Sequence, residues 1–328
     1  MILLNALVIF ILTLFVGRTG LPIIRRLQLR QTVRSDGPKS HFKKSGTPTF
    51  GGLFFLIPMG LSAIILPIIN PNWLIYSVIM LLTLAFGLVG FIDDYIKVRV
   101  DKEGLSVLQK TIFLLAVCIS FSVWYLWFSN LEIIIHIPFI EEGILVTGNW
   151  KYLYMIFIIL YLFFMANAVN ITDGVDGLVS TLMTITSLSL AILLYIVFKE
   201  DMKTPYLIAA CLALAAGCLG FLPFNKNPAK IFMGDTGSQA LGACFAVIAL
   251  LAGVPWIMLF LGLIYILEAL STLIQVIYFK LTNGKRIFKM APLHHHFELS
   301  GWTEKKVVTR FSVFTLICGG LSLLLLLL

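Results

Sequence analysis

Apolar residues along the chain form ten long stretches, each separated from the next by a polar segment. Most approach or reach the roughly 20 mainly apolar residues that a bilayer-spanning helix requires. Because backbone groups inside lipid must be hydrogen-bonded within the chain, we expect these stretches to be helices. The predicted spans cover residues 2–17, 49–69, 74–92, 111–129, 152–170, 178–198, 205–222, 237–253, 256–279 and 311–328. The pattern predicts an all-α integral membrane protein with ten transmembrane helices.

The composition supports this prediction. Of the 328 residues, 59% are hydrophobic and 12% are charged, whereas soluble domains average about 45–50% and about 25%. The longest polar segments, 18–48 and 280–310, have 31 residues each and are too short for an independent soluble domain. We therefore expect a single polytopic membrane domain over residues 1–328, and we exclude soluble proteins, including those that bind nucleic acid.

The basic residues indicate which side of the membrane each connection occupies. The connections after the odd-numbered spans carry 21 of the 24 Lys and Arg residues, and only Lys151, Lys199 and Lys203 lie on the other side. By the positive-inside rule the basic side is cytoplasmic, so both termini are predicted to lie outside. The external segment 130–150 contains an alternating stretch, 132–139, that predicts a short hairpin. The cytoplasmic loops cover about 18–48, 93–110, 171–177, 223–236 and 280–310.

Acidic residues gather at the cytoplasmic ends of the predicted spans. Carboxylates at a membrane boundary are costly and usually functional. Since these acids all belong to one face of the membrane, the fold can bring them together in one active-site cleft on the cytoplasmic side. They are Asp93, Asp94, Asp173, Asp176 and Asp235.

The first acidic cluster consists of adjacent carboxylates, Asp93 and Asp94, followed by Lys97. Lys97 follows Asp93 by four residues, so the two share a helical face. One interpretation is an interfacial salt bridge with Asp94 solvated. The other is that the paired carboxylates bind Mg²⁺ or that one of them accepts a proton.

In the second cluster, polar residues recur every three positions from 167 to 176. They share a face if the segment is helical, and Gly174 and Gly177 allow the backbone to turn and to approach a ligand closely. A polar helix end with a glycine cap would account for only one of the acids. The recurring residues are Asn167, Asn170, Asp173 and Asp176.

The third cluster, residues 224–238, contains Lys226, Lys230 and Asp235 just before an apolar span. The amides at the start of a helix, together with lysine, favour phosphate. Asp235 lies among these cations, where it either reaches the phosphate through a metal ion or caps the eighth span.

Three consecutive histidines, His294, His295 and His296, occur in the last loop. Consecutive residues cannot easily face one ion, and the cysteine partners of structural zinc are absent, so zinc is disfavoured. Hydrogen bonds to a diphosphate or a sugar fit these side chains better. In the ninth span, Glu268 and Gln275 lie on one face and predict a polar contact between or within helices, or a ligand contact.

Taken together, the motifs closely resemble the bacterial phospho-N-acetylmuramoyl-pentapeptide transferases, a branch of the polyprenyl-phosphate N-acetylhexosamine-1-phosphate transferases. The resemblance covers the whole chain in order, and the segment 291–298 (APLHHHFE) is the most specific to this branch. Departures are apolar, such as Phe50 where the family often has Met and Val175 where it often has Leu. The motifs are residues 46–49, Asp93–Asp94, 170–177, 225–238 and 290–298.

The resemblance implies a Mg²⁺-dependent enzyme of the bacterial cytoplasmic membrane, acting as a homodimer. It transfers phospho-N-acetylmuramoyl-pentapeptide from UDP-N-acetylmuramoyl-pentapeptide to undecaprenyl phosphate, giving lipid I and UMP. The alternative within this class is a UDP-N-acetylglucosamine:undecaprenyl-phosphate transferase, which the histidine motif disfavours. A transporter would line a path near the bilayer midplane with polar residues, whereas here they lie at one rim.

The resemblance also assigns roles. Asp235 is predicted to hold Mg²⁺ on the donor diphosphate, with Asp94 and Asp173 either as further ligands or as acids that lie behind the ligands. Asp93 deprotonates or orients the lipid phosphate, which attacks directly or after an aspartyl-phosphate intermediate. His294 is expected at the diphosphate or its sugar. The predicted substrate contacts are Lys44, Asn225, Phe232 and the turn Gly174–Asp176 at the nucleoside, Lys97 and Lys110 at phosphate, Thr49 at the lipid entrance, His295 and His296 in support, and Asn170, Asp173 and Gln275.

Overall fold

The structure, a computed structural model, describes residues 1–29, 46–101, 103–137 and 143–327. Short 3₁₀ turns, η2 (Pro71–Trp73) and η4 (Pro255–Ile257), and a π-helical turn, η3 (Trp124–Phe128), join or extend the helices. The helices are α1 (Ile2–Arg26), α2 (Leu53–Ile69), α3 (Leu74–Arg99), α4 (Val107–Val123), α5 (Trp150–Thr172), α6 (Leu178–Val197), α7 (Thr204–Asn225), α8 (Gly234–Leu251), α9 (Met258–Leu261), α10 (Leu263–Leu281), α11 (Leu293–Glu298) and α12 (Glu304–Leu327).

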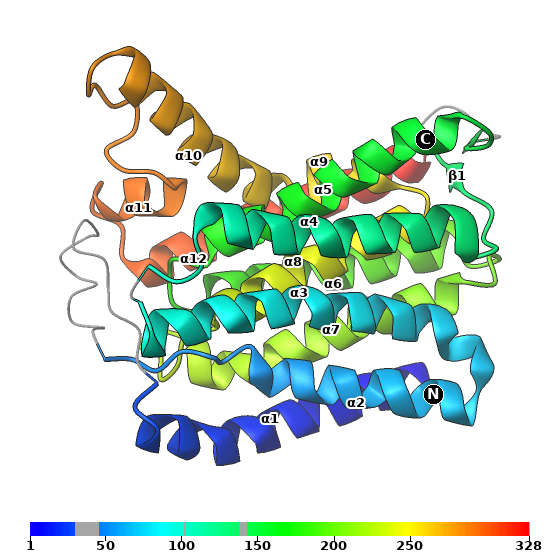
Figure 1. Cartoon of the computed structure of the whole chain (residues 1–328), viewed down its shortest axis with the longest axis horizontal. Helices are drawn as coiled ribbons and strands as arrows, with labels where there is room; N and C mark the ends of the chain where they lie inside the picture. The colour runs from blue at the N-terminus through cyan, green and yellow to red at the C-terminus, as the bar shows by residue number, and fades with distance from the viewer. Residues whose placement is uncertain (30–45, 102, 138–142, 328) are drawn as a thin grey trace.

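Nine of the ten predicted spans each overlap one helix of this bundle, and the ninth is divided among η4, α9 and α10. Within the described residues, nine helices are long and apolar enough to cross a membrane, and α2, with 17 residues, is shorter. The prediction of an all-α membrane fold is therefore confirmed. Both chain ends lie at one end of the bundle, and α11 lies at the other (Figure 1).

The helices differ from several of the predicted span boundaries. α1 extends to Arg26 instead of ending near residue 17, since Leu21 and Ile24 are buried in the bundle. α3 extends to Arg99, so Asp93 and Asp94 lie within the helix and not after it. The ninth predicted span is broken at Gly262 into η4, α9 and α10.

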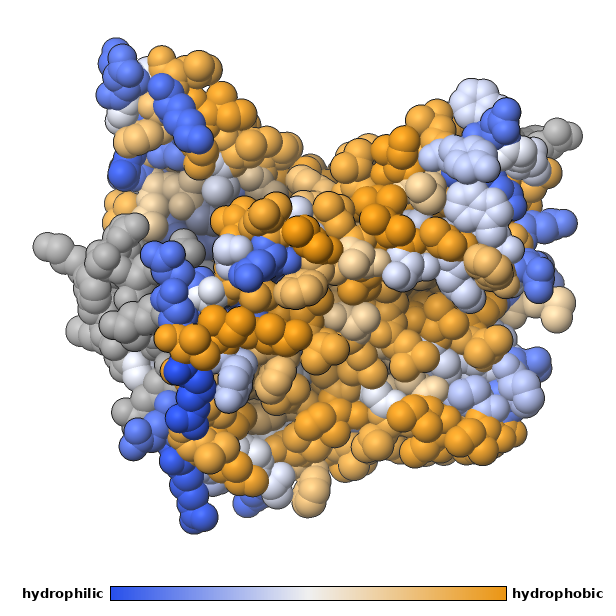
Figure 2. Space-filling model, in the orientation of Figure 1, coloured by the Kyte–Doolittle hydropathy of each residue, from blue (hydrophilic) through white to orange (hydrophobic). Residues whose placement is uncertain are grey.

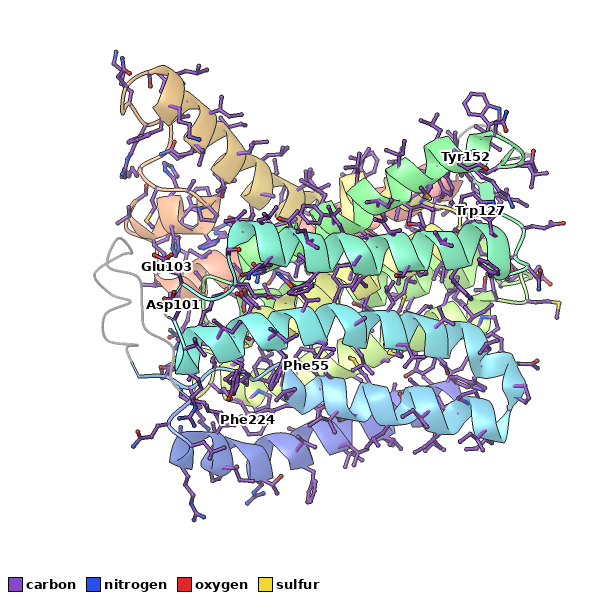
Figure 3. The ribbon with its side chains drawn as sticks, in the orientation of Figure 1. Phe55, Asp101, Glu103, Trp127, Tyr152 and Phe224 are labelled. Atoms are coloured by element: carbon purple, nitrogen blue, oxygen red, sulfur yellow. The ribbon has the colours of Figure 1, made fainter. Side chains whose placement is uncertain are left out.

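The surface of the bundle has the pattern of a membrane protein. Hydrophobic residues cover the middle of the visible face, and hydrophilic residues lie at both ends (Figure 2). Asp101 and Glu103 mark one end, whereas Trp127 and Tyr152 lie together at the other, with ring centroids 5.6 Å apart (Figure 3). Aromatic side chains of this kind are typical of a membrane–water interface.

Helix α8 forms the centre of the bundle and packs against α3, α5 and α7. Every residue from Thr236 to Leu251 is buried. In contrast, α10 projects away from the other helices at the α11 end (Figure 1), and many of its apolar residues are exposed. The first turn of α8, which begins at Gly234, lies at the α11 end of the bundle (Figure 1). The predicted site residues occur at this end.

The segment between α4 and α5 contains a two-stranded antiparallel sheet of β1 (Ile134–Ile135) and β2 (Ile144–Leu145), in which Ile134 pairs with Leu145. The predicted hairpin within 132–139 is thus corrected: its first strand lies there, but the second comes later in the chain. The His136 amide donates to the Gly253 carbonyl at 2.8 Å, which ties the sheet to the turn after α8.

Candidate active site

Two lysines and two aspartates form an ion-pair cluster at the start of α8. Lys97 Nζ lies 2.7 Å from Asp93 Oδ2 and 2.8 Å from Asp235 Oδ2. Lys110 Nζ, from the first turn of α4, lies 3.0 Å from Asp93 Oδ2 and 2.5 Å from Asp235 Oδ2. The predicted pair of Lys97 with Asp93 is therefore present, and each ammonium group also bridges to a carboxylate 125 or more positions away.

Asn170 and a backbone amide complete the hydrogen bonding of this cluster. Asn170 Nδ2 donates to Asp235 Oδ1 and to Ser238 Oγ, both at 2.8 Å. The Leu105 amide donates to Asp93 Oδ1 at 2.8 Å. Both carboxylates are thus fixed by donors from three or more elements, which makes the cluster rigid.

Asp94 caps helix α8. Its Oδ1 accepts from the Asp235 amide at 3.2 Å, and its Oδ2 accepts from the Thr236 amide at 2.9 Å and from Thr236 Oγ1 at 2.6 Å. A carboxylate at this position satisfies amides that have no partner within the helix. The alternative that Asp235 caps its own helix is therefore wrong: Asp235 is the second residue of α8, and the cap comes from α3.

Close contact between α3 and α8 places Asp235 beside the pair Asp93–Asp94. A Cβ atom on Gly90 would overlap with the backbone carbonyl of Asp235 and lie 2.6 Å from the Thr236 amide nitrogen. Only glycine permits this approach. Helix α3 therefore fixes the position of Asp235 in two ways, through the side-chain cap at Asp94 and through the backbone contact at Gly90.

Asp173 follows the end of α5 and differs from the other acids. The helix ends at Thr172, so the predicted common helical face does not continue to Asp173 and Asp176, and Asn167 Nδ2 donates to the Phe163 carbonyl of its own helix. No described residue donates a hydrogen bond to the Asp173 carboxylate. Burial, together with the negative charges of Asp235 and Asp94, raises the pKa of Asp173 well above its ordinary value.

Asp176 and Asn225 hold the loop before α8. Asp176 Oδ2 accepts from the Ala229 amide at 2.9 Å and from Asn227 Nδ2 at 3.3 Å. Asn225 accepts from Ser180 Oγ at 2.9 Å and donates to the Ile231 carbonyl at 3.2 Å. In this structure Asp176 joins the loop 226–233 to the turn between α5 and α6, and Asn225 joins the same loop to α6 itself.

The segment before α2 lies against the same loop. The Phe232 amide donates to the Pro48 carbonyl at 2.8 Å, and the Gly51 amide donates to the Phe232 carbonyl at 2.9 Å. The Phe232 ring is half-buried. Thr49 Oγ1 is buried, has no hydrogen-bond partner in the described part of the chain, and would lie 2.7 Å from a Cβ atom on Gly234. Lys44 lies outside the described residues.

The three consecutive histidines have three different partners. His294 Nδ1 lies 3.0 Å from Glu268 Oε2 of α10, His295 Nδ1 lies 2.8 Å from Glu298 Oε2, and His296 Nδ1 accepts from the Lys289 amide at 3.1 Å. Over the described ranges, no group of three or more His, Cys, Asp or Glu side chains is arranged to hold a metal ion. The three rings therefore have separate partners in this structure.

Gln275 holds the loop that leads to α11. Its Oε1 accepts from the Ile287 and Phe288 amides, both at 3.1 Å, and its Nε2 donates to the Phe288 carbonyl at 3.0 Å. These bonds occupy both ends of the amide. Gln275 therefore connects α10 to the loop residues Ile287 and Phe288 in this structure. It lies about two helical turns after Glu268.

Sequence reasoning did not assign three residues that complete the site: Glu268 at His294, Thr236 at Asp94 and Ser238 at Asn170. A signal existed for Glu268, because an acid inside an apolar span needs a partner. Thr236 and Ser238 follow Asp235 directly, but nothing in their spacing identifies partners on α3 and α5.

Comparisons with known proteins define the class and then the family. The profile of "Glycosyl transferase family 4" matches residues 76–253, so the bundle is a membrane transferase by class. A phospho-N-acetylmuramoyl-pentapeptide-transferase of Acetivibrio thermocellus is 46% identical over 317 residues, covering 94% of this chain and 90% of the relative. Proteins of the same name are 43% identical in Listeria innocua (93% of this chain, 91% of the relative) and 40% identical in Staphylococcus carnosus (98% of each).

The chain therefore belongs to the phospho-N-acetylmuramoyl-pentapeptide transferase family, and the resemblance predicted from its motifs is confirmed. Together with its apolar helices, this makes it a multi-pass bacterial membrane protein.

Proposed function

We propose that this protein transfers phospho-N-acetylmuramoyl-pentapeptide from UDP-N-acetylmuramoyl-pentapeptide to undecaprenyl phosphate, with lipid I and UMP as products. The relatives that bear this name span almost the whole chain. The observation that carries the proposal is the cluster of Lys97, Lys110, Asp93 and Asp235 at one end of an apolar bundle. Two fixed ammonium groups at a membrane rim suit a reaction between a lipid phosphate and a water-soluble diphosphate.

Charge balance supports a divalent cation at this site. Lys97 and Lys110 form ion pairs with Asp93 and Asp235, but among the described residues no cation forms an ion pair with Asp94 or Asp173. Two phosphate substrates would add further negative charge. The site therefore needs additional positive charge before both can bind, and Mg²⁺ is the usual ion for phosphate oxygens.

Asp173 and Asp235 are the residues that we propose hold Mg²⁺. Carboxylate oxygens are the donor type that the ion prefers, and Mg²⁺ commonly takes only one or two carboxylates together with substrate phosphates. Asp173 accepts no hydrogen bond from a described side chain or amide, so its oxygens are available. Asp94 and Asp235 each accept three hydrogen bonds. The donors to Asp235 are side chains that substrate phosphates could engage instead, whereas two of those to Asp94 are backbone amides of α8, so Asp94 is the less suitable ligand. When bound, the ion would neutralise charge that develops on the leaving phosphate.

Asp93, Lys97 and Lys110 are proposed to orient the lipid phosphate. A phosphate monoester has a second pKa near 6 and already carries a nucleophilic oxyanion at neutral pH, so it needs little help from a base. Asp93 fixes both ammonium groups, which place the oxyanion for attack on the sugar-proximal phosphorus. That phosphorus forms a bond to the lipid oxygen and releases UMP.

A two-step path, in which an aspartate attacks first and forms an acyl phosphate, uses the same residues. Omitting the lipid acceptor distinguishes the two paths. A phosphorylated enzyme trapped under these conditions would favour the two-step path, whereas lipid-dependent UMP release without such a species would favour direct attack.

On the donor side, Asn225, Phe232 and the turn Gly174–Asp176 are proposed to receive the nucleoside, with the Phe232 ring against the uracil face. Four further residues remain predicted contacts to the substrate: Lys44, His295, His296 and Gln275. His294 is proposed to contact the diphosphate or its sugar, since its Nε2 faces the same turn.

The experiment that tests the function is UMP release by the detergent-purified protein with Mg²⁺ and undecaprenyl phosphate. UDP-N-acetylmuramoyl-pentapeptide and UDP-N-acetylglucosamine are supplied in parallel. We expect release only with the first donor, together with a lipid-linked muramoyl-pentapeptide. Release only with UDP-N-acetylglucosamine would reject the proposed donor but would still be compatible with the acidic site. Release with neither donor would reject the proposed reaction.

Removal of the metal gives a second prediction. Chelation with EDTA is expected to stop turnover, and added Mg²⁺ to restore it. Because the pKa of Asp173 is raised, protons compete with the ion at this carboxylate. The Mg²⁺ concentration needed for half-maximal rate should therefore fall as pH rises, and Asp173→Asn should raise it. Full activity in EDTA would remove the metal from the mechanism.

For the arrangement in the membrane, we propose ten spans with the site on the cytoplasmic side, both termini outside, and a homodimer. The basic connections and the family resemblance support this arrangement. Labelling of single cysteines introduced near residues 147 and 285 in intact cells would test the orientation, and sedimentation in detergent would test the dimer.

A further inference from the structure

A buried carboxylate on α10 binds two groups of one histidine. Glu268 Oε1 accepts from the His294 backbone amide at 3.1 Å, and Glu268 Oε2 lies 3.0 Å from His294 Nδ1. Both side chains are fully buried, with 0% of their surface exposed. No other described side chain donates to this carboxylate, so His294 alone satisfies it.

This arrangement fixes α11 as well as the imidazole ring. His294 is the second residue of α11, a helix of six residues, and its amide has no partner within that helix. The carboxylate supplies that partner from α10. The ring is therefore held by its own backbone, by α10 and by the neighbouring His295 ring, whose centroid lies 4.2 Å away.

The opposite ring nitrogen faces the site. His294 Nε2 is buried and has no hydrogen-bond partner within the described residues. A Cβ atom on Gly174 would overlap with Nε2 and lie 2.9 Å from Cε1. Nε2 thus points at Gly174, which has no side chain and follows Asp173 directly. A buried polar atom without a partner is costly, and at this position it is available to a ligand.

From this geometry we infer that Glu268 is a positioning residue: it holds the proton of His294 on Nδ1 and directs Nε2 toward the turn at Gly174. The two oxygens of a carboxylate accept hydrogen bonds, and Oε1 already accepts from the His294 amide; Nδ1 is therefore assigned as the donor to Oε2. Nε2 is then the only ring nitrogen whose hydrogen-bonding role toward a substrate can vary. The inference rests on the proposed function, in which His294 contacts the donor.

The substitution Glu268→Gln tests this directly. The glutamine oxygen can still accept from the His294 amide, which leaves the NH₂ group facing Nδ1. Because NH₂ only donates, Nδ1 must become the acceptor and the proton moves to Nε2. We expect kcat/KM for UMP release to fall by about a hundredfold, and Glu268→Asp, which keeps the carboxylate, to recover part of this loss.

The tautomer is read independently of activity, by ¹⁵N NMR of histidine-labelled protein, which contains five histidines. We expect a protonated Nδ1 for His294 in the unaltered protein and an unprotonated Nδ1 in Glu268→Gln. Glu298→Gln is the matched control: Glu298 makes the same type of contact with His295, so its replacement should change the His295 signals and leave those of His294.

Two results would overturn the inference. One is a Glu268→Gln enzyme whose rate lies within twofold of the unaltered protein. The other is a loss of rate while His294 keeps its proton on Nδ1, which would assign Glu268 a purely structural role. Failure of the proposed function is a different outcome, because the unaltered protein would then release no UMP while the tautomer pattern is still measured.

Discussion

Replacing Asp235 with asparagine is expected to lower the rate of UMP release by about a thousandfold. Asp235 Oδ1 accepts from Asn170, and its Oδ2 accepts from both lysines. In asparagine one of these atoms becomes an NH₂ group that faces another donor. The substitution also removes the negative charge that balances two ammonium groups and, as proposed, a ligand of Mg²⁺.

The matched control for this prediction is Asp201→Asn. Asp201 lies in the connection between α6 and α7, where it pairs with Lys203 at 3.4 Å. Asp201 is also a carboxylate paired with a lysine, but it lies at the opposite end of the bundle. The rate of UMP release by Asp201→Asn should therefore stay within about twofold of that of the unaltered protein. Similar losses in the two variants would contradict the site described here. Unchanged thermal stability of Asp235→Asn in detergent would show that chemistry, and not folding, was lost.

Gly90→Ala is the second change with a large expected effect. The added methyl group would overlap with the backbone of Asp235, and backbone cannot rotate away as a side chain can. α8 must therefore shift relative to α3 by several tenths of an ångström or more. A misplacement of about 1 Å at a reacting group costs about a hundredfold in rate, so we expect a loss of this size and a lower melting temperature.

Gly320→Ala controls for the substitution itself. Gly320 lies inside α12, and a Cβ atom there would meet no atom within 4 Å. Alanine favours a helix over glycine by about 1 kcal/mol, so this variant should retain both its rate and its stability. A Gly90→Ala enzyme that matched it in both measurements would show that the contact between α3 and α8 does not fix the position of Asp235.

The sequence predicted the helices well because lipid imposes a strong and simple requirement on them. An apolar run long enough to cross a bilayer identifies a helix without knowledge of its neighbours. The ends were less predictable, since α1 continues to Arg26 through contacts that the apolar pattern does not contain. The break at Gly262 was not predicted either, because the apolar residues continue across it.

The sequence predicted which residues form the site, but for the most part it did not predict which of them contact one another. Spacing alone identified the pair of Lys97 with Asp93, which are four residues apart in one helix. It did not identify Asp94 as the cap of α8, because that contact joins positions 141 and 142 residues apart. Glu268 was visible as a costly intramembrane acid, but its partner depends on how α10 and α11 are placed.

The burial of α8 has a consequence for how the enzyme responds to its bilayer. Lateral pressure and lipid thickness act on helices that touch lipid, and the residues of α8 from Thr236 onward are enclosed by other helices. The carboxylate of Asp235 is therefore carried by the part of the protein that lipids cannot reach, whereas α10 is widely exposed to them. A change of membrane composition should therefore act on the geometry around α10 more than on the helix that carries Asp235.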